Sequence, residues 1–232
     1  MDTPDAPESS RRLRKTEIVA TFVEISSFTE SRWETLASQA LQAGGILVHP
    51  TTSVYGIGGT GRLSDHTVAR LKGRAGSIPI LRLVRDVEQL RRLHPAVRWS
   101  AEAELLAAEF WPGPLTLVLD DGSEQGLAVR TEAHPVTRQL LARLDGEIGS
   151  TSLNLTGEPP ARTAPEARRI LRALPEADAP LYFLTAGDLP GPPPSTLLSL
   201  RAEVPRILRE GAIRREQIER SIRTPVLPES SP

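Results

Sequence analysis

The sequence predicts an α/β protein, because strand-like and helix-like segments alternate along most of the chain. Apolar runs of strand length, such as 46–48 and 115–119, recur between segments whose apolar residues are spaced three or four apart. Glycine and proline clusters separate the two kinds of segment. The 232 residues suit one large domain, or one domain with a small appendage.

In the first half of the chain, glycines and small polar residues mark the element boundaries. The predicted elements are a strand at 18–25, a helix at 29–43, a strand at 45–50, a glycine-rich loop at 51–61, a helix at 64–74 and a strand at 79–84. Gly44 and Gly45 end the first helix. We expect Ser64 to cap the second helix, with Asp65 at its positive end.

In the second half, proline marks helix boundaries. The predicted helices are 100–110, 135–144, 165–174 and 214–222, and the predicted strands are 115–119, 126–130, 149–152, 181–184, 196–200 and 205–209. No helix can continue through the prolines of 111–114. Residues 1–15 are predicted to be a disordered tail and 224–232 a C-terminal tail, which leaves one domain at 16–223.

Composition excludes several classes of protein. The chain has no cysteine, so disulfides, thiolate catalysis and cysteine-ligated metals are excluded. The four histidines are far apart in sequence, and we expect no metal site. A net charge of -1 argues against binding of nucleic acid through the electrostatic field of the whole protein.

No apolar run approaches the roughly 20 residues of a membrane span, and the N-terminus has no signal-peptide pattern. We therefore expect a soluble cytoplasmic protein.

Lysine is rare in a chain with 28 basic residues, since only Lys15 and Lys72 occur. Lys72 is the only lysine outside the polar tail. Either this is chance, or position 72 needs a compact ammonium for which a guanidinium does not substitute. Arg74 follows two residues later, and together the pair could hold a polyanion. The simpler alternative is a cationic helix C-terminus.

Gly56, Gly58 and Gly61 match the dinucleotide-binding pattern G-x-G-x-x-G, with Asp86 beyond the next strand. In that motif the first glycine follows the strand almost at once, whereas here five residues separate Pro50 from Gly56. The spacing therefore argues against a dehydrogenase.

Hydroxyl and basic side chains recur near predicted strand ends, where α/β sheets bind ligands. They are Thr51, Thr52, Ser53, Lys72, Arg74, Arg130, Ser150, Thr151, Ser152, Asn154, Thr156, Ser195, Thr196 and Arg209. These groups suit an anionic ligand rich in hydrogen-bonding atoms. The chain has no G-x-S-x-G elbow and no Ser–His–Asp order, which disfavours a serine nucleophile.

The chain resembles the YrdC family of threonylcarbamoyl-AMP synthases in a series of motifs that occur in the family's order. They are HPTTSVYGIG (49–58), LKGR (71–74), FWPGPLTLVL (110–119), LAVRTEAHP (127–135), GSTSLNLTGEPP (149–160), PST (194–196) and ILREGAI (207–213). Together they span about residues 30–213, most of the chain.

The resemblance implies a twisted mixed sheet flanked by helices, with a concave ligand cleft. It also implies that L-threonine, bicarbonate and ATP with Mg²⁺ give threonylcarbamoyl-AMP and pyrophosphate. A downstream tRNA threonylcarbamoyl transferase would then modify the adenosine next to the anticodon. Direct binding of tRNA or double-stranded RNA is a further partner expectation, and no membrane is expected.

The family's site residues carry over to matching positions of this chain. By resemblance, Lys72 and Arg74 are catalytic and hold the triphosphate. The implied ATP-binding set is Lys72, Arg74, Ser152, Asn154 and Arg209. The implied threonine-binding set is Thr51, Tyr55, Arg130, Ser150 and Ser195.

Four positions depart from the family pattern. Thr52 stands where the family has Asp or Glu, Leu153 where it has Ala, Ser199 where it has Asp, and Ile78 where a polar residue is common. Leu153 is expected to add bulk beside the nucleotide. The alternative is therefore a catalytically weak YciO-type paralogue that binds nucleotide or RNA in the same cleft, although such relatives typically lack the Lys-x-Arg pair.

Overall fold

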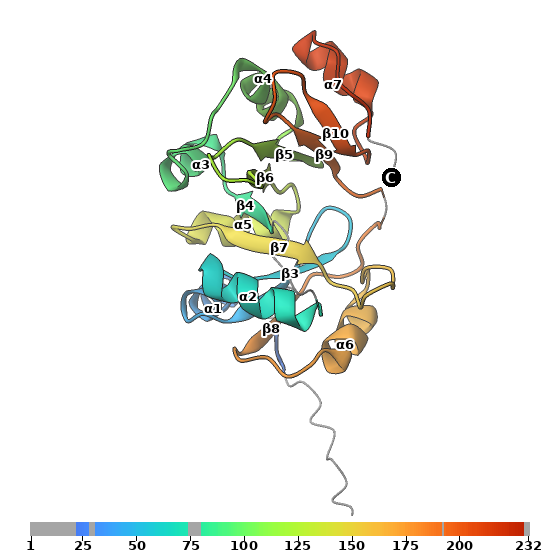
Figure 1. Cartoon of the computed structure of the whole chain (residues 1–232). Coiled ribbons are helices and arrows are strands. Elements are labelled where there is room, and N and C mark those ends of the chain that lie inside the picture. Colours follow the sequence, from blue (N-terminus) through green and yellow to red (C-terminus); the bar gives the residue numbers. More distant parts are fainter. Residues whose placement is uncertain (1–21, 28–30, 74–79, 192, 230–232) are drawn as a thin grey trace, which may run out of the picture.

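The computed structural model describes residues 22–27, 31–73, 80–191 and 193–229. Its ten strands form one mixed open sheet with helices packed on it (Figure 1). The strands are β1 (Phe22–Ser26), β2 (Ile46–Pro50), β3 (Tyr55–Gly58), β4 (Leu81–Val84), β5 (Leu115–Leu119), β6 (Leu127–Thr131), β7 (Ile148–Ser152), β8 (Leu181–Thr185), β9 (Thr196–Ser199) and β10 (Arg206–Arg209). The helices are α1 (Trp33–Gln42), α2 (Gly61–Leu71), α3 (Val87–Leu93), α4 (Ala101–Phe110), α5 (Pro135–Arg143), α6 (Ala164–Ala173) and α7 (Arg215–Ile222).

The sheet has two halves that meet at β7. The strand order is β1-β8-β2-β3-β7-β4-β6-β5-β9-β10. β7 pairs antiparallel with β3 on one side and with β4 on the other. Parallel pairs occur in both halves, between β2 and β8 and between β4 and β6. The predicted α/β class and mixed sheet are confirmed.

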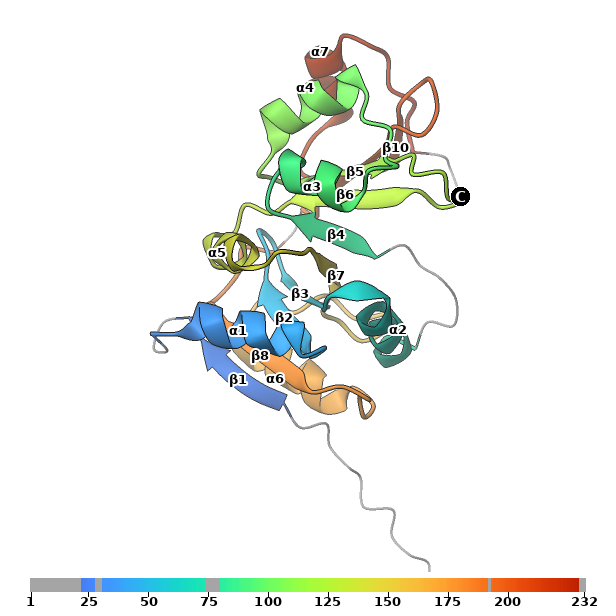
Figure 2. The same ribbon diagram turned by 90° about the vertical axis from the view of Figure 1, so that its left-hand side faces the viewer.

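Three hydrophobic clusters hold the helices on the sheet. One joins β2, β3 and β8 to α2 and α6, through residues such as Ile57 and Phe183. A second joins α1 and α5 through Leu41 and Leu140. The third lies in the other half, where alternate residues of β5 and β6 pack with α4 and α7. Figure 2 shows α1 and α5 on one side of the sheet and α2 on the other.

The ten elements predicted in the second half of the chain are all present, each within one residue of its expected bounds. Their boundaries are set by local chemistry. Thr163 and Glu166 form a reciprocal capping box at the start of α6. Helix α4 ends at Phe110, before the turn 111–114, in which the Gly113 N–H donates to the Thr131 carbonyl at 3.0 Å.

The glycine-rich stretch 51–61 is not a simple loop, because it contains β3. Gly58 lies so close to β7 that a Cβ there would be 1.5 Å from the Gly149 carbonyl oxygen. A Cβ on Gly56 would meet Ser150 Oγ at 2.8 Å. These glycines allow close packing of two strands, which explains the G-x-G pattern without a dinucleotide.

Three other expectations in this region are corrected. Helix α2 begins at Gly61, so Ser64 lies inside it and donates to the Thr60 carbonyl at 2.9 Å. Asp65 forms an ion pair with Arg82 of β4 and does not lie in the first turn of the helix, where it was expected to interact with the helix dipole. Helix α3 was not predicted, although Asp86 caps it by accepting from the Gln89 N–H at 2.7 Å.

The predicted C-terminal tail packs on the fold for part of its length. Val226 is buried, and the Leu227 N–H donates to the Pro205 carbonyl while the Leu227 carbonyl accepts from Ile207. The predicted N-terminal tail lies outside the described residues. Among the helices of the described ranges, none is both long and apolar enough to cross a membrane.

Candidate active site

Lys72 lies directly after α2, and its ammonium turns toward the end of β7. Its side chain is buried in a residue that is only 4% exposed. Nζ donates to the Ser152 carbonyl at 2.8 Å, to the Asn154 carbonyl at 2.7 Å and to Asn154 Oδ1 at 2.5 Å. Lys72 occupies the C-cap position of α2, but its ammonium bonds to oxygens at and just after the end of β7. A role as a cationic helix C-terminus therefore does not account for this side chain.

Ser152 and Asn154 form the other side of this cluster. Ser152 Oγ donates to Asn154 Oδ1 at 2.8 Å. The Asn154 amide nitrogen donates to the carbonyls of Leu155 and Glu158, which sets the orientation of the amide. The structure thus brings together three of the predicted ATP-binding residues. Arg74 lies outside the described residues, as does Ile78.

Arg130 lies on β6 in the other half of the sheet. It is 7% exposed, and its Nη2 donates to Oε2 of Glu132. Its Nε is buried and has no hydrogen-bond partner among the described residues. Leu127 and Val129 of β6 pack in the cluster with α4 and α7, so period-2 alternation directs Arg130 to the opposite face.

Glu132 was not among the predicted site residues, yet it is the most completely bonded side chain of this region. Its exposure is 0%. Oε1 accepts from the Thr52 N–H at 2.9 Å, from Thr52 Oγ1, from the Ala133 N–H at 2.9 Å and from the His134 N–H at 3.2 Å. Burial alone would raise the pKa of Glu132, but Arg130 and the hydrogen bonds from Thr52 and His134 lower it, so the carboxylate is ionised.

The contact between Thr52 and Glu132 indicates that the sheet is curved. Thr52 follows β2 and Glu132 follows β6, and three strands lie between β2 and β6 in the sheet order. In a flat sheet these strands would be about 19 Å apart, since neighbours are spaced about 4.8 Å. Because the two side chains bond directly, the sheet bends to bring its halves together on one side.

Ser150 contacts His49 between these two clusters. Ser150 Oγ lies 3.2 Å from His49 Nε2, and His49 Nδ1 lies 3.4 Å from the Pro50 carbonyl. Complete burial lowers the pKa of His49 to about 4, so its ring is neutral at pH 7. Since a carbonyl only accepts, Nδ1 is the donor and Nε2 accepts from Ser150. His49, to which the sequence indicated no chemistry, therefore orients a predicted threonine-binding hydroxyl.

Ser195 and Arg209 lie together at the other end of the site. Arg209 Nη2 donates to the Ser195 carbonyl at 2.9 Å and to its Oγ at 3.3 Å. Ser195 Oγ is also 3.1 Å from Thr116 Oγ1, on the same face of β5 that Arg130 occupies on β6. Partial desolvation, and then the charge of Arg130, lower the pKa of Arg209, so the two guanidiniums are electrostatic neighbours.

The hydroxyls of two predicted threonine-binding residues, Thr51 and Tyr55, both donate to backbone carbonyls of the protein. Thr51 Oγ1 donates to the Val54 carbonyl at 2.6 Å and closes the turn before β3. Tyr55 is 0% exposed and packs edge-on against Phe183, with its hydroxyl donating to the Gly187 carbonyl at 2.7 Å. In the described conformation the Tyr55 ring therefore packs in the core.

The Leu153 side chain points away from the cluster of Lys72, Ser152 and Asn154, whereas the sequence had led us to expect it beside that cluster. The residue is 0% exposed and belongs to the cluster with α2 and α6. Its N–H donates to the Tyr55 carbonyl and its carbonyl accepts from the Ala161 N–H, both at 2.8 Å. Its neighbours Ser152 and Asn154 bond with Lys72, whereas Leu153 points into the core.

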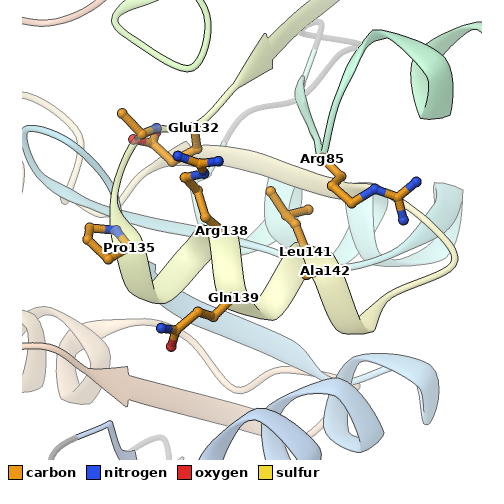
Figure 3. A pocket seen from close by; sticks show the side chains of 8 residues that line it. Arg85, Glu132, Pro135, Arg138, Gln139, Leu141 and Ala142 are labelled. Carbon is orange, nitrogen blue, oxygen red and sulfur yellow. Dashed lines mark hydrogen bonds between the residues drawn. The ribbon is translucent and has the colours of Figure 1, made fainter.

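A cavity of about 500 Å³ lies beside α5 (Figure 3). Its lining residues are Arg85, Glu132, Ala133, Pro135, Arg138, Gln139, Leu141 and Ala142. None of the residues predicted from the sequence to form the site lines it, although Glu132 does. Within the described ranges, no group of three or more His, Asp or Glu side chains is arranged to hold a metal ion.

The arrangement can bind anions and position them, and it offers no preformed nucleophile. Lys72 supplies a buried ammonium, and Arg130 supplies a buried guanidinium that is paired with Glu132. Ser150, Ser152 and Ser195 supply hydroxyls near these cations. Cationic groups held in a water-poor site stabilise negative charge that develops during a reaction. This chemistry suits phosphate and carboxylate groups.

Comparison with known proteins gives concordant matches. A family model of the Sua5, YciO and YrdC proteins, described as "Telomere recombination", matches residues 39–211. A threonylcarbamoyl-AMP synthase of Pyrococcus abyssi is 30% identical over 199 residues, covering 81% of this chain and 56% of that protein. A protein of Mycobacterium tuberculosis is 34% identical over 199 residues, covering 81% and 88%. The structure of P. abyssi Sua5 complexed with L-threonine has a TM-score of 0.74 at 24% identity, covering 89% and 62%. The chain thus spans little more than half the length of the Pyrococcus relative.

Proposed function

Because this chain belongs to the Sua5–YciO–YrdC family, we propose that it is a nucleotidyltransferase that makes threonylcarbamoyl-AMP. Its substrates are L-threonine, bicarbonate and ATP, and its second product is pyrophosphate. In this proposal the product supplies a tRNA threonylcarbamoyl transferase in the cytoplasm, which modifies the adenosine next to the anticodon. The name of the Pyrococcus relative supports the reaction, and the threonine held by P. abyssi Sua5 supports the amino-acid substrate.

The observation that carries the proposal is the buried guanidinium of Arg130, whose Nε has no partner among the described residues. A guanidinium in that state can bind the carboxylate of an amino acid. In this proposal Ser150 and Ser195 hydrogen-bond the polar groups of threonine. Thr51 and Tyr55 shape the site through the turn and the core beneath it.

The nucleotide side is proposed to contain Lys72, Arg74, Ser152, Asn154 and Arg209. The three protons of the Lys72 ammonium are matched by three oxygens in the described conformation. A triphosphate oxygen would take the place of one of them. Lys72 therefore both fixes the segment after β7 and presents charge to the phosphates, with Arg74 as the bidentate partner.

The reaction needs positioning more than covalent help. Bicarbonate takes up a proton and loses water to give CO₂. The threonine amine then forms a bond to the CO₂ carbon and loses a proton, which gives a carbamate. A carbamate oxygen then forms a bond to the α-phosphorus of ATP, and the bond from that phosphorus to the bridging oxygen of pyrophosphate breaks. Charge grows on the leaving pyrophosphate, where Lys72 and Arg74 stabilise it. Mg²⁺ would enter as part of the substrate MgATP and would offset negative charge on the phosphates.

The test is product formation from purified chain, L-threonine, bicarbonate and MgATP, followed by mass spectrometry. We expect threonylcarbamoyl-AMP only when threonine and bicarbonate are both present, with serine as the matched amino-acid control. Pyrophosphate release that does not depend on threonine would contradict the proposal. ATP binding without product would support the YciO-type alternative instead.

A further inference from the structure

Glu132 joins two segments that are distant in the sequence, the turn after β2 and its own segment 130–134. Its carboxylate accepts from Thr52 in the turn after β2, from Arg130 on β6 and from the N–H groups of Ala133 and His134 before α5. Thr52 and Arg130 belong to different halves of the sheet. One side chain thus connects the two halves across three intervening strands.

Both oxygens of the Glu132 carboxylate are bonded to the protein, and the side chain has no exposed surface for a ligand to contact. Oε1 accepts from two N–H groups after β6 and from both the N–H and the hydroxyl of Thr52, while Oε2 accepts from Arg130. The side chain is fully buried. Any influence of Glu132 on a substrate must therefore act through the residues that it holds.

Those residues lie within the proposed threonine site. Thr52 is next to Thr51, whose hydroxyl and N–H both donate to the Val54 carbonyl and close the turn 51–54. On the other side, the bond from Nη2 fixes the plane of the Arg130 guanidinium and leaves Nε free of protein partners in the described ranges. An arginine loses considerable rotamer freedom on binding, and a preformed partner removes much of that cost.

We propose that Glu132 is a positioning residue that orients the Arg130 guanidinium and sets its separation from the turn 51–54, and that it thereby fixes the width of the threonine site. This inference rests on the proposed function, since it concerns the same substrate. It predicts that loss of the carboxylate weakens threonine binding while ATP binding is retained.

The test compares Glu132→Gln with wild type in the product-forming reaction, varying threonine and ATP separately. The amide keeps the size of the side chain, but it places an N–H against a donor and removes the charge that pairs with Arg130. We expect KM for threonine to rise about 10-fold or more, because hydrogen bonds to charged groups contribute strongly. KM for ATP should stay within about 2-fold of wild type, since Lys72 and Asn154 do not contact Glu132.

Glu147→Gln is the matched control. Glu147 is also a largely buried carboxylate paired with a strand arginine, Arg82, and it lies outside the proposed site. This variant should leave KM for threonine within about 2-fold of wild type. Calorimetric titration with threonine alone should give the same ranking of the two variants.

Thr52→Val supplies a second test should Glu132→Gln fail to fold. It removes one donor to Glu132 and keeps the bond from Arg130, so we expect a rise of about 3-fold or more in KM for threonine. An unchanged KM for threonine in the folded variants overturns the role of Glu132 alone. A wild-type chain that makes no threonine-dependent product overturns the proposed function and this inference with it.

Discussion

Lys72 contacts Asn154 twice, since its Nζ donates to the backbone oxygen at 2.7 Å and to the side-chain oxygen at 2.5 Å. With the Ser152 carbonyl at 2.8 Å, these oxygens surround a single ammonium at the end of α2. The arrangement explains why an arginine-rich chain has lysine here. Three acceptors that converge on one point suit a compact donor and not a planar fork.

Lys72→Ala and Lys72→Arg should both lose about 100-fold or more in the rate of product formation. Alanine removes the donor, and the planar guanidinium of arginine does not fit the three converging oxygens. The measurement is threonylcarbamoyl-AMP formed per enzyme per minute. Arg70→Ala is the matched control, since Arg70 lies on the same helix in an exposed pair with Asp178. An active Lys72→Arg variant would contradict the need for an ammonium.

Gly58→Ala should lower the free energy of unfolding by about 3 kcal/mol or more, because the new Cβ would meet the Gly149 carbonyl of β7. Gly146→Ala serves as the control, since a Cβ there meets nothing within 4 Å and its change should be within about 0.5 kcal/mol. Urea unfolding monitored by circular dichroism gives both values. Equal stabilities of the two variants would show that β3 and β7 can separate at little cost.

His49 should make stability fall in mildly acidic solution. The unfolded ring binds a proton below about pH 6.5, whereas burial lowers the folded pKa to about 4. Between these values the unfolded state holds more protons, so the free energy of unfolding decreases as the pH falls. From pH 7 to pH 4.5 we expect wild type to lose about 2 to 3 kcal/mol more than His49→Gln. Parallel losses in urea titrations of the two proteins would rule out this contribution.

Leu153→Ala should destabilise the fold by about 2 to 5 kcal/mol, because it leaves a cavity under a fully buried side chain. It should not lower KM for ATP, since Leu153 points away from Lys72 into the core. Urea unfolding and ATP titration in the product assay measure the two effects. Tighter ATP binding in the variant would restore the view that Leu153 crowds the nucleotide.

The sequence predicted elements best where local chemistry alone decides them. The helix ending before 111–114 and the capping of α6 at Thr163 are such cases. β3 was missed because Gly56 and Gly58 have low strand propensity, and only the close approach of β7 explains them. Helix α3 has one full cap but only seven residues, too few for a clear apolar period.

In the candidate site too, residues placed by local sequence could be predicted, and residues placed by distant contacts could not. The nucleotide cluster of Lys72, Ser152 and Asn154 was anticipated, because each residue lies beside an element end and matches a family motif. Glu132 was not, since its meaning depends on a contact 80 residues away in the chain. One sequence feature could have indicated Glu132. It is an acidic residue two positions after an arginine in a predicted strand, and it lies just before the predicted helix at 135–144.

The two halves of the sheet give the site a mechanical property. Lys72 follows a helix packed in one hydrophobic cluster, Arg130 lies on a strand packed in another, and β7 is the strand between them. β7 meets β3 through two registered residue pairs, Gly56 with Ser152 and Ile57 with Thr151. Hydrogen bonds from the Leu153 N–H to the Tyr55 carbonyl and from the Gly149 N–H to the Gly59 carbonyl extend this contact at both ends. A small shear at this seam would alter the gap between a bound carbamate and an α-phosphate while both cores stay packed. The stiffness of the contact between β3 and β7 would then influence how often the two groups meet in a reactive geometry.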